Sequence, residues 1–140
     1  MSAEASVPRA ADGTLRVRHR SIALLVAVLA AVAVWSGATL AGAQLTVDQG
    51  AGPQDVTVLA VIMNSGLAAL LGWGLLAVLE RLSARATTIW TGIAVAVLVL
   101  SLVPVLLVDA SAGTRWALVL MHLVVGAIVI LGFRRGARHA

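Results

Sequence analysis

The sequence predicts an all-α membrane protein, built as an antiparallel bundle of four transmembrane helices. Hydrophobic residues make up 61% of the 140-residue chain and charged residues only 11%, with a mean hydropathy of +1.03. Such a composition lies outside the range of soluble domains. In addition, four apolar stretches are each long enough to cross a hydrocarbon core of about 30 Å, which takes roughly 20 helical residues. These stretches cover approximately residues 22–45, 56–79, 89–108 and 116–133.

Charged or turn-forming residues bound each stretch and divide the chain into parts. Arginine-rich "RVRHRS" precedes the first stretch, "TVDQGAGPQD" separates it from the second, "ERLSARATT" and "DASAGTR" precede the third and fourth, and "RRGARHA" follows. Membrane strands are excluded because they need only about 10 residues and alternate polar with apolar positions. We expect a disordered cytoplasmic tail over residues 1–20, a membrane domain over 21–133 and a basic cytoplasmic tail over 134–140.

The arginines predict which side of the membrane each connection occupies. Positively charged flanks are retained in the cytoplasm. Arginines precede the first stretch, lie between the second and third, and follow the fourth, whereas only Arg115 falls on the other side, where three aspartates also lie. All ten basic residues counted as Lys or Arg are arginine, which together with abundant Ala, Val, Leu and Gly indicates a GC-rich bacterial genome. We therefore expect a plasma-membrane protein with both termini cytoplasmic and the 46–55 and 109–115 loops outside.

The first stretch has a second interpretation, as a signal peptide. Arginines, an apolar run and the small residues "AGA" at 41–43 before Gln44 imitate a cleavage site. The run from Ile22 to Leu45 is, however, longer than the roughly 7–15 residues of a signal core. Its length favours an uncleaved helix, and cleavage, which would leave three helices, stays open.

Residues at the ends of the stretches have expected boundary roles. Trp90 and Trp116 stand at the starts of the third and fourth stretches, where the aromatic belts of membrane interfaces occur. Glu80 and Arg81 adjoin the cytoplasmic end of the second stretch and are expected to be a solvated stop.

Polar side chains inside the spans form the candidate functional site. Given the predicted sidedness, Asn64, Ser101, Asp109 and His122 all fall in the outer half of the membrane. Arg115 lies seven residues before His122 and so shares its helix face. A polar group in hydrocarbon is costly and usually faces a partner or a cavity. Because the third and fourth helices are joined by a short segment, we expect a small polar pocket open to the outside.

Two interpretations of this pocket compete. In the structural one, His122 bonds across helices to Asn64 or Ser101, while Asp109 pairs with Arg115 at the water boundary. In the functional one, the imidazole binds or relays a proton, or coordinates a small ligand that enters from outside. We favour the structural interpretation, because polar contacts between helices are ordinary in membrane bundles.

Pro104 is expected to kink the third helix in its outer half. Proline removes one backbone hydrogen bond from a helix and clashes with the preceding turn. Ser101, one turn earlier, is placed to help satisfy a freed carbonyl.

Other chemistry is disfavoured by the residues that the sequence lacks or places elsewhere. Cys is absent, which excludes disulfides, thiolate metal sites and cysteine nucleophiles. No phosphate-binding glycine loop, HExxH motif or nucleophile elbow occurs. His19 and His139 lie in the predicted tails, so His122 has no second intramembrane histidine for a haem or redox centre. We expect no enzymatic activity, no cofactor and, since the arginines flank membrane segments, no nucleic-acid partner.

Two segments resemble a known family. "LSLVP" in the third helix and "LMHLVVGAIVILGFRR" in the fourth are similar to a family of small actinobacterial four-helix multi-pass membrane proteins catalogued as a domain of unknown function. The resemblance covers most of the chain from Ser21 to Arg135. It implies the same four-helix layout and brings no established activity, substrate or catalytic residue.

The expected role is therefore a structural or accessory component of the cell membrane. Its expected partners are membrane lipids and either further copies of the chain or another membrane protein. The alternative is a small transporter or proton-coupled module that uses His122, Asp109 and Asn64. Because four helices are few for a complete solute path, transport would require a homo-oligomer.

Overall fold

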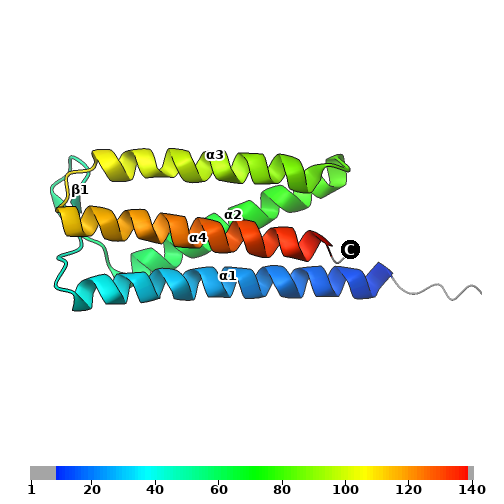
Figure 1. Cartoon of the computed structure of the whole chain (residues 1–140), viewed down its shortest axis with the longest axis horizontal. Coiled ribbons are helices and arrows are strands. Elements are labelled where there is room, and N and C mark those ends of the chain that lie inside the picture. Colours follow the sequence, from blue (N-terminus) through cyan, green and yellow to red (C-terminus); the bar gives the residue numbers. More distant parts are fainter. Residues whose placement is uncertain (1–8, 139–140) are drawn as a thin grey trace, which may run out of the picture.

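The structure, a computed structural model, describes the backbone of residues 9–138 and the side chains of residues 13–137. Four helices account for most of it: α1 (Arg9–Leu40), α2 (Val58–Leu82), α3 (Ala86–Leu107) and α4 (Ala112–Arg138) (Figure 1). All four are long and apolar enough to span a membrane. The predicted all-α, four-helix fold is confirmed, and it has the form of a multi-pass membrane protein.

Consecutive helices alternate in direction, so the bundle is antiparallel (Figure 1). Helix α4 packs between α1 and α3, with its most extensive contact on α1. Helix α2 crosses behind α4 at an angle, since it begins beside α1 and ends beside α3 (Figure 1). It therefore makes few contacts with α4. Helices α2 and α3 therefore meet at one end of the bundle and diverge toward the other.

The first predicted tail is largely helical, which corrects the expectation of disorder over residues 1–20. Helix α1 begins at Arg9, well before the apolar stretch, and α4 continues to Arg138, through most of the predicted C-terminal tail. Arginine, alanine and leucine are good helix formers, and a helix already nucleated in the span extends into them at little cost. Residues 1–8 and 139–140 lie outside the described residues.

Helix α1 ends earlier than predicted because of a glycine turn. Gly42 has a φ of +84°, and its N–H donates to Thr39 O while Ala43 N–H donates to Ala38 O, both at 3.0 Å. These two bonds form a Schellman motif, which takes up carbonyls that the helix end would otherwise leave unpaired. Glycine reaches this left-handed conformation without the penalty that a side chain imposes.

Hydroxyl side chains cap the N-termini of α2 and α4. Thr57 Oγ1 accepts from Ala60 N–H at 3.2 Å at the start of α2, and Ser111 Oγ accepts from Thr114 N–H at 3.2 Å at the start of α4. Each satisfies an N–H that the first helical turn leaves free. Helix α4 thus begins before the predicted residue 116.

A short hairpin that the sequence analysis did not predict joins α1 to α2. Strand β1 (Thr46–Asp48) pairs antiparallel with β2 (Pro53–Asp55). Asp48 Oδ1 accepts from Gly50 N–H at 2.7 Å and from Gly52 N–H at 3.1 Å, and both glycines have positive φ. The carboxylate therefore shapes the turn that reverses the chain.

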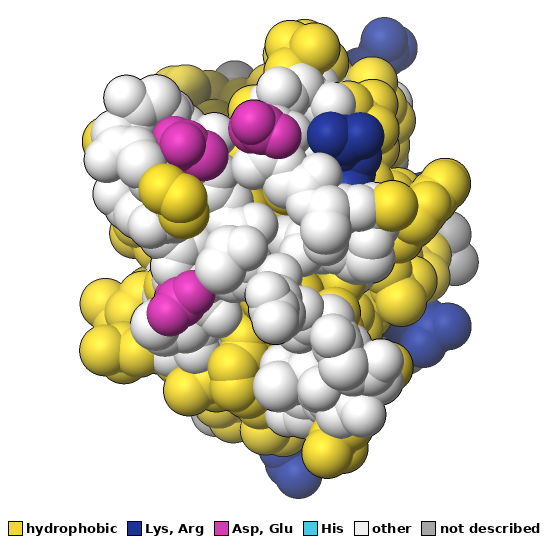
Figure 2. All heavy atoms as spheres, turned by 90° about the vertical axis from the view of Figure 1, so that its left-hand side faces the viewer, with side chains coloured by type: hydrophobic (Ala, Val, Ile, Leu, Met, Phe, Trp, Pro, Cys, Tyr) yellow, Lys and Arg dark blue, Asp and Glu magenta, His cyan; other side chains and the backbone are white. Residues whose placement is uncertain are grey.

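The hairpin closes one end of the bundle, which we call the hairpin end. Asp48 N–H donates to Asp109 O at 3.0 Å, and Thr114 Oγ1 donates to Gln44 O at 2.7 Å. These bonds tie the α1–α2 connection to the α3–α4 connection. Seen from this side, acidic side chains are spread over the surface, with a basic side chain beside one of them (Figure 2). The opposite end, which we call the arginine end, contains the start of α1, the α2–α3 turn and the end of α4.

Helix α1 contacts α4 through small side chains. Ala23, Ala27 and Ala31 recur every four residues on one face of α1, and all three are buried. Opposite them, Gly132 of α4 lies so close that a Cβ added to it would stand 2.5 Å from the Cβ of Ala23. Close backbone approach of this kind supplies van der Waals contact between membrane helices. The larger buried cluster consists of Ala23, Ala27, Ala69, Leu76, Trp90, Val129 and Phe133.

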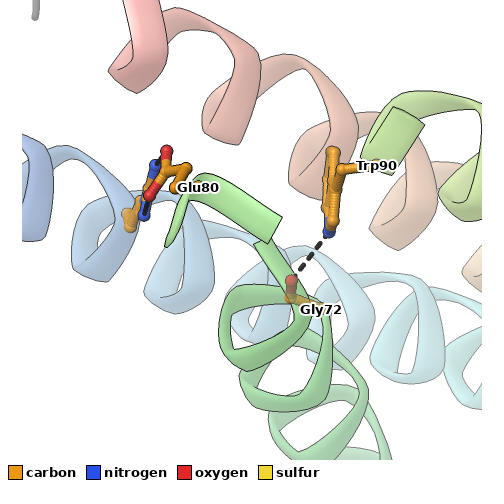
Figure 3. A network of polar contacts seen from close by, with 4 residues as sticks. Gly72, Glu80 and Trp90 are labelled. Atoms are coloured by element: carbon orange, nitrogen blue, oxygen red, sulfur yellow. Dashed lines mark hydrogen bonds and ion pairs between the residues drawn. The ribbon is translucent and has the colours of Figure 1, made fainter. Parts of the chain in front are cut away.

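Trp90 is a core residue, so its expected place in an aromatic belt is wrong. It is 1% exposed, and its Nε1–H donates to Gly72 O of α2 at 2.7 Å (Figure 3). Its ring centroid lies 5.5 Å from that of Phe133. A backbone carbonyl that accepts the indole N–H allows this large side chain to be buried. Trp116, in contrast, is 72% exposed at the start of α4, as a belt residue would be.

Glu80 is not the solvated stop that the sequence analysis expected. Arg20 of α1 holds it with both terminal nitrogens: Nη1 donates to Glu80 Oε2 at 3.1 Å, and Nη2 donates to Oε1 (Figure 3). The Arg20 side chain is only 5% exposed and that of Glu80 24%. The helical extension of α1 before its apolar stretch brings this guanidinium against α2, where Arg81 stays exposed.

Candidate functional site

A cleft of about 1200 Å³ lies between α2, α3 and α4, beneath the hairpin. We call it the α2–α3 cleft. Met121 and Val129 of α4 are buried at its floor, whereas lining residues of α2 and α3, such as Ala68 and Val97, are exposed. The cleft therefore opens sideways between α2 and α3, along the part of the bundle where these helices diverge.

Three of the five predicted pocket residues line this cleft, one from each helix. They are Asn64 of α2, Ser101 of α3 and His122 of α4. Asp109 and Arg115 are not among its lining residues. The structure thus brings together the three polar residues within the spans and separates them from the two near the α3–α4 turn.

The three residues lie at similar depth. Asn64 is six residues from the start of α2, Ser101 is six from the end of α3, and His122 is ten from the start of α4. At about 1.5 Å of rise per residue, they lie roughly 9, 9 and 15 Å below the hairpin-side ends of their helices. All three are in the half of the bundle nearer the hairpin end.

His122 bonds to its own helix. Its Nδ1 lies 2.8 Å from Leu118 O, one turn earlier, and the side chain makes no other hydrogen bond to the described residues. A carbonyl oxygen only accepts, so Nδ1 carries the hydrogen. In the neutral ring Nε2 is consequently an acceptor without a partner in the described part of the chain.

Asn64 and Ser101 also bond within their own helices. Asn64 Nδ2 donates to Ala60 O at 2.8 Å, and Ser101 Oγ donates to Leu98 O at 2.7 Å. The expected cross-helix bonds from His122 to these residues are therefore not formed. Short polar side chains in a helix readily reach the carbonyl three or four residues back, which competes with a partner across a gap.

Asp109 and Arg115 do not form the expected ion pair. Arg115 Nη2 donates to Val108 O at 3.2 Å, at the end of α3. Asp109 has an exposed side chain, and its backbone carbonyl accepts from Asp48. Because α4 begins directly after the turn, Arg115 is positioned to hold the turn's backbone.

Pro104 lies inside α3, three residues before its end, and lines the cleft. The helix continues through it to Leu107, and the expected kink stays a prediction. The lost bond falls in the last turn, where few helical bonds depend on it. Ser101 does not take up the freed Leu100 carbonyl, because its hydroxyl bonds to Leu98 instead.

A protein family described as a family of unknown function, DUF6069, matches residues 11–139. The chain belongs to the DUF6069 family. The matched segment contains all four apolar helical spans, the hairpin and the α2–α3 cleft of this DUF6069 chain. The expected resemblance to a family of unknown function is confirmed. No curated protein and no solved structure matches the chain.

Several residues that shape the α2–α3 cleft are not among those predicted from the sequence. Asp48 and Gln49 of the hairpin line its roof, and Ser65, next to Asn64, is buried in its wall and donates to Val61 O at 2.6 Å. The signal for the hairpin was present, because two short segments flank the turn-forming "QGAGP".

The polar side chains of this cleft do not bond to one another. Its serine hydroxyls donate to carbonyls of their own helices, and neither bonds to His122. Over the described residues, no three His, Asp or Glu side chains are grouped in a way that could hold a metal ion. The cleft has a large apolar surface, with polar groups from three helices in the half of the bundle nearer the hairpin end.

Proposed function

We propose that this protein is a multi-pass component of the bacterial plasma membrane with both termini in the cytoplasm. The charge difference between the two ends of four membrane-length helices carries the proposal. Asp48, Asp55 and Asp109 lie at the hairpin end, and all arginines except Arg115 lie at the arginine end. Positively charged flanks favour the cytoplasmic side.

The orientation can be tested by cysteine labelling, because the chain contains no Cys. We expect Gln54→Cys, exposed in β2, to react with a membrane-impermeant maleimide on intact cells. Ala84→Cys, exposed in the α2–α3 turn, is expected to react only after the membrane is permeabilised. The unsubstituted chain is the blank for both variants. Labelling of Ala84→Cys but not Gln54→Cys on intact cells would reverse the proposed orientation.

Within the membrane, we propose a structural or accessory role without enzymatic activity. The support is that the polar side chains of the cleft are hydrogen-bonded to their own helices, while large apolar side chains are exposed on all four helices. Such surfaces are suited to lipid, to further copies of the chain or to another membrane protein.

A second candidate is a small transporter or proton-coupled module. The observation that favours it is the convergence of Asn64, Ser101 and His122 from three helices on one cleft. Intramembrane ionisable residues that face a cavity commonly mark ion or substrate paths.

Proton flux into vesicles separates the two candidates. For an accessory protein, we expect purified protein in liposomes that contain a pH-sensitive dye to give no flux above protein-free liposomes. A flux that His122→Gln lowers at least tenfold, at an unchanged melting temperature, would replace the accessory role with transport. His19→Gln is the matched control, since His19 Nδ1 also contacts the carbonyl four residues back, Leu15 O, at 2.7 Å but lies outside the cleft.

A further inference from the structure

The α2–α3 cleft has the size and access of a site for an elongated apolar molecule. Its volume of about 1200 Å³ exceeds the roughly 300–1,000 Å³ of ordinary ligand pockets. Alanine, valine, leucine and isoleucine supply most of its lining. Because exposed lining residues lie on α2 and α3, a molecule can enter between these helices at the level of the spans.

The polar groups in the cleft have already used most of their donors. His122 Nδ1–H is directed to Leu118 O and the Ser101 hydroxyl to Leu98 O, which leaves His122 Nε2 and the Ser101 oxygen lone pairs as acceptors. Asn64 donates one N–H to its own helix, and its Oδ1 accepts from none of the described residues. A partner that donates hydrogen bonds is therefore the one that all three residues can accommodate.

The charges around the cleft also favour a partner that donates hydrogen bonds. Asp48 lies at the roof with one carboxylate oxygen in the hairpin turn, and no arginine is among the lining residues. The remaining donors, on the amides of Asn64 and Gln49, carry no charge. An anionic head group would meet acceptors and a carboxylate without a cation to balance it, which is unfavourable in a low-dielectric site.

The depth of the acceptors limits the size of the head group. They lie roughly 9–15 Å below the hairpin-side helix ends, by the helical rise. A bulky, strongly hydrated head group would have to leave the interface to reach them. A hydroxyl group is uncharged and small enough to be carried to this depth on an apolar chain. A long-chain amine is protonated near neutral pH, so its binding also depends on a counter-charge, which Asp48 at the roof of the cleft offers.

We infer that the α2–α3 cleft binds an apolar molecule with a small, hydrogen-bond-donating head group, an alcohol or an amine, that enters sideways from the membrane. The inference goes beyond the proposed function, because it concerns binding alone and requires neither transport nor a particular orientation of the termini.

Native mass spectrometry of the full-length protein, released from detergent micelles, tests this inference with three probes of equal chain length. Hexadecanol and hexadecylamine are expected to form one-to-one complexes, and palmitate is expected to bind about tenfold more weakly, as the loss of one good hydrogen bond would give. If the amine binds more tightly than the alcohol, Asp48 also contacts the head group. If the two bind equally, only the neutral acceptors of the cleft contact it. Palmitate bound as tightly as the other two would overturn the inference.

Variants locate the site. The double variant His122→Leu, Ser101→Ala removes two acceptors and is expected to weaken alcohol binding about tenfold or more. Ser21→Ala is the matched control, because Ser21 Oγ donates to Val17 O at 2.9 Å on α1, outside the cleft. Wild-type affinity in the double variant would contradict the inference.

A second variant tests the site in case the double variant does not fold. Ala68 lines the cleft and is exposed, so Ala68→Phe narrows the space without entering the packed core. Binding of the alcohol and the amine is expected to be lost while the melting temperature is retained. Unchanged binding would place both molecules elsewhere on the protein and would also overturn the inference.

Discussion

Replacement of Glu80 by leucine is expected to lower the free energy of unfolding by about 3 kcal/mol, measured by denaturant titration in detergent. The substitution leaves the Arg20 guanidinium, with a side chain only 5% exposed, without its carboxylate. Arg20 Nε is already buried without a partner in the described part of the chain, so the charge has no second acceptor to replace Glu80. The lower end of the range for broken buried ion pairs is expected, because Glu80 is partly exposed.

A double variant distinguishes lost pairing from lost packing. Arg20→Met combined with Glu80→Leu removes both charges and is expected to regain most of the stability, since apolar residues often replace a buried pair without loss. Arg81→Leu, at the exposed neighbouring position, is expected to change stability by less than about 0.5 kcal/mol. If the double variant is no more stable than Glu80→Leu alone, an unpaired charge is not the cause.

Gly132→Ala is the second substitution with a large expected effect, a loss of about 2 kcal/mol. Its Cβ would stand 2.5 Å from the Cβ of Ala23 and 3.6 Å from that residue's Cα. Neither atom lies at the end of a flexible side chain, so α1 and α4 must move apart along their most extensive contact.

Two further variants make this prediction specific. Gly74→Ala has no atom within 4 Å of the added Cβ and is expected to leave stability unchanged or slightly higher. Ala23→Gly in the Gly132→Ala background removes the opposing methyl group and is expected to restore most of the loss. Equal losses for Gly132→Ala and Gly74→Ala would contradict the prediction, because Gly74→Ala meets no neighbouring atom and alanine is the better helix former. The free energies of unfolding of all these variants are measured by the same denaturant titrations.

The four spans could be predicted from the sequence because membrane-length apolar runs are a local property. Where each helix ends depended on a few capping contacts. Gly42 ends α1 before the apolar run does, and Ser111 starts α4 before the predicted residue. The hydropathy pattern contains neither contact, although glycine and serine are the residue types expected at such ends.

The depth of Asn64, Ser101 and His122 could likewise be predicted by counting residues along each span. Their partners could not, because these depend on how each helix is rotated and on whether a side chain finds its own carbonyl first. From the sequence, Arg20 is only a cytoplasmic flank, whereas the longer α1 places it against Glu80.

The backbone hydrogen bond between Asp48 and Asp109 limits how a molecule can enter and leave the cleft. It ties the hairpin to the α3–α4 turn above the cleft, and the Trp90–Gly72 bond joins α3 to α2 where these helices meet below it. A molecule held between these two closures would have the gap between α2 and α3 as its way in and out, and the lining extends from Asp48 at the hairpin end to Trp90 in the other half of the bundle. The occupancy of the cleft would then follow the composition of the lipid beside α2 and α3.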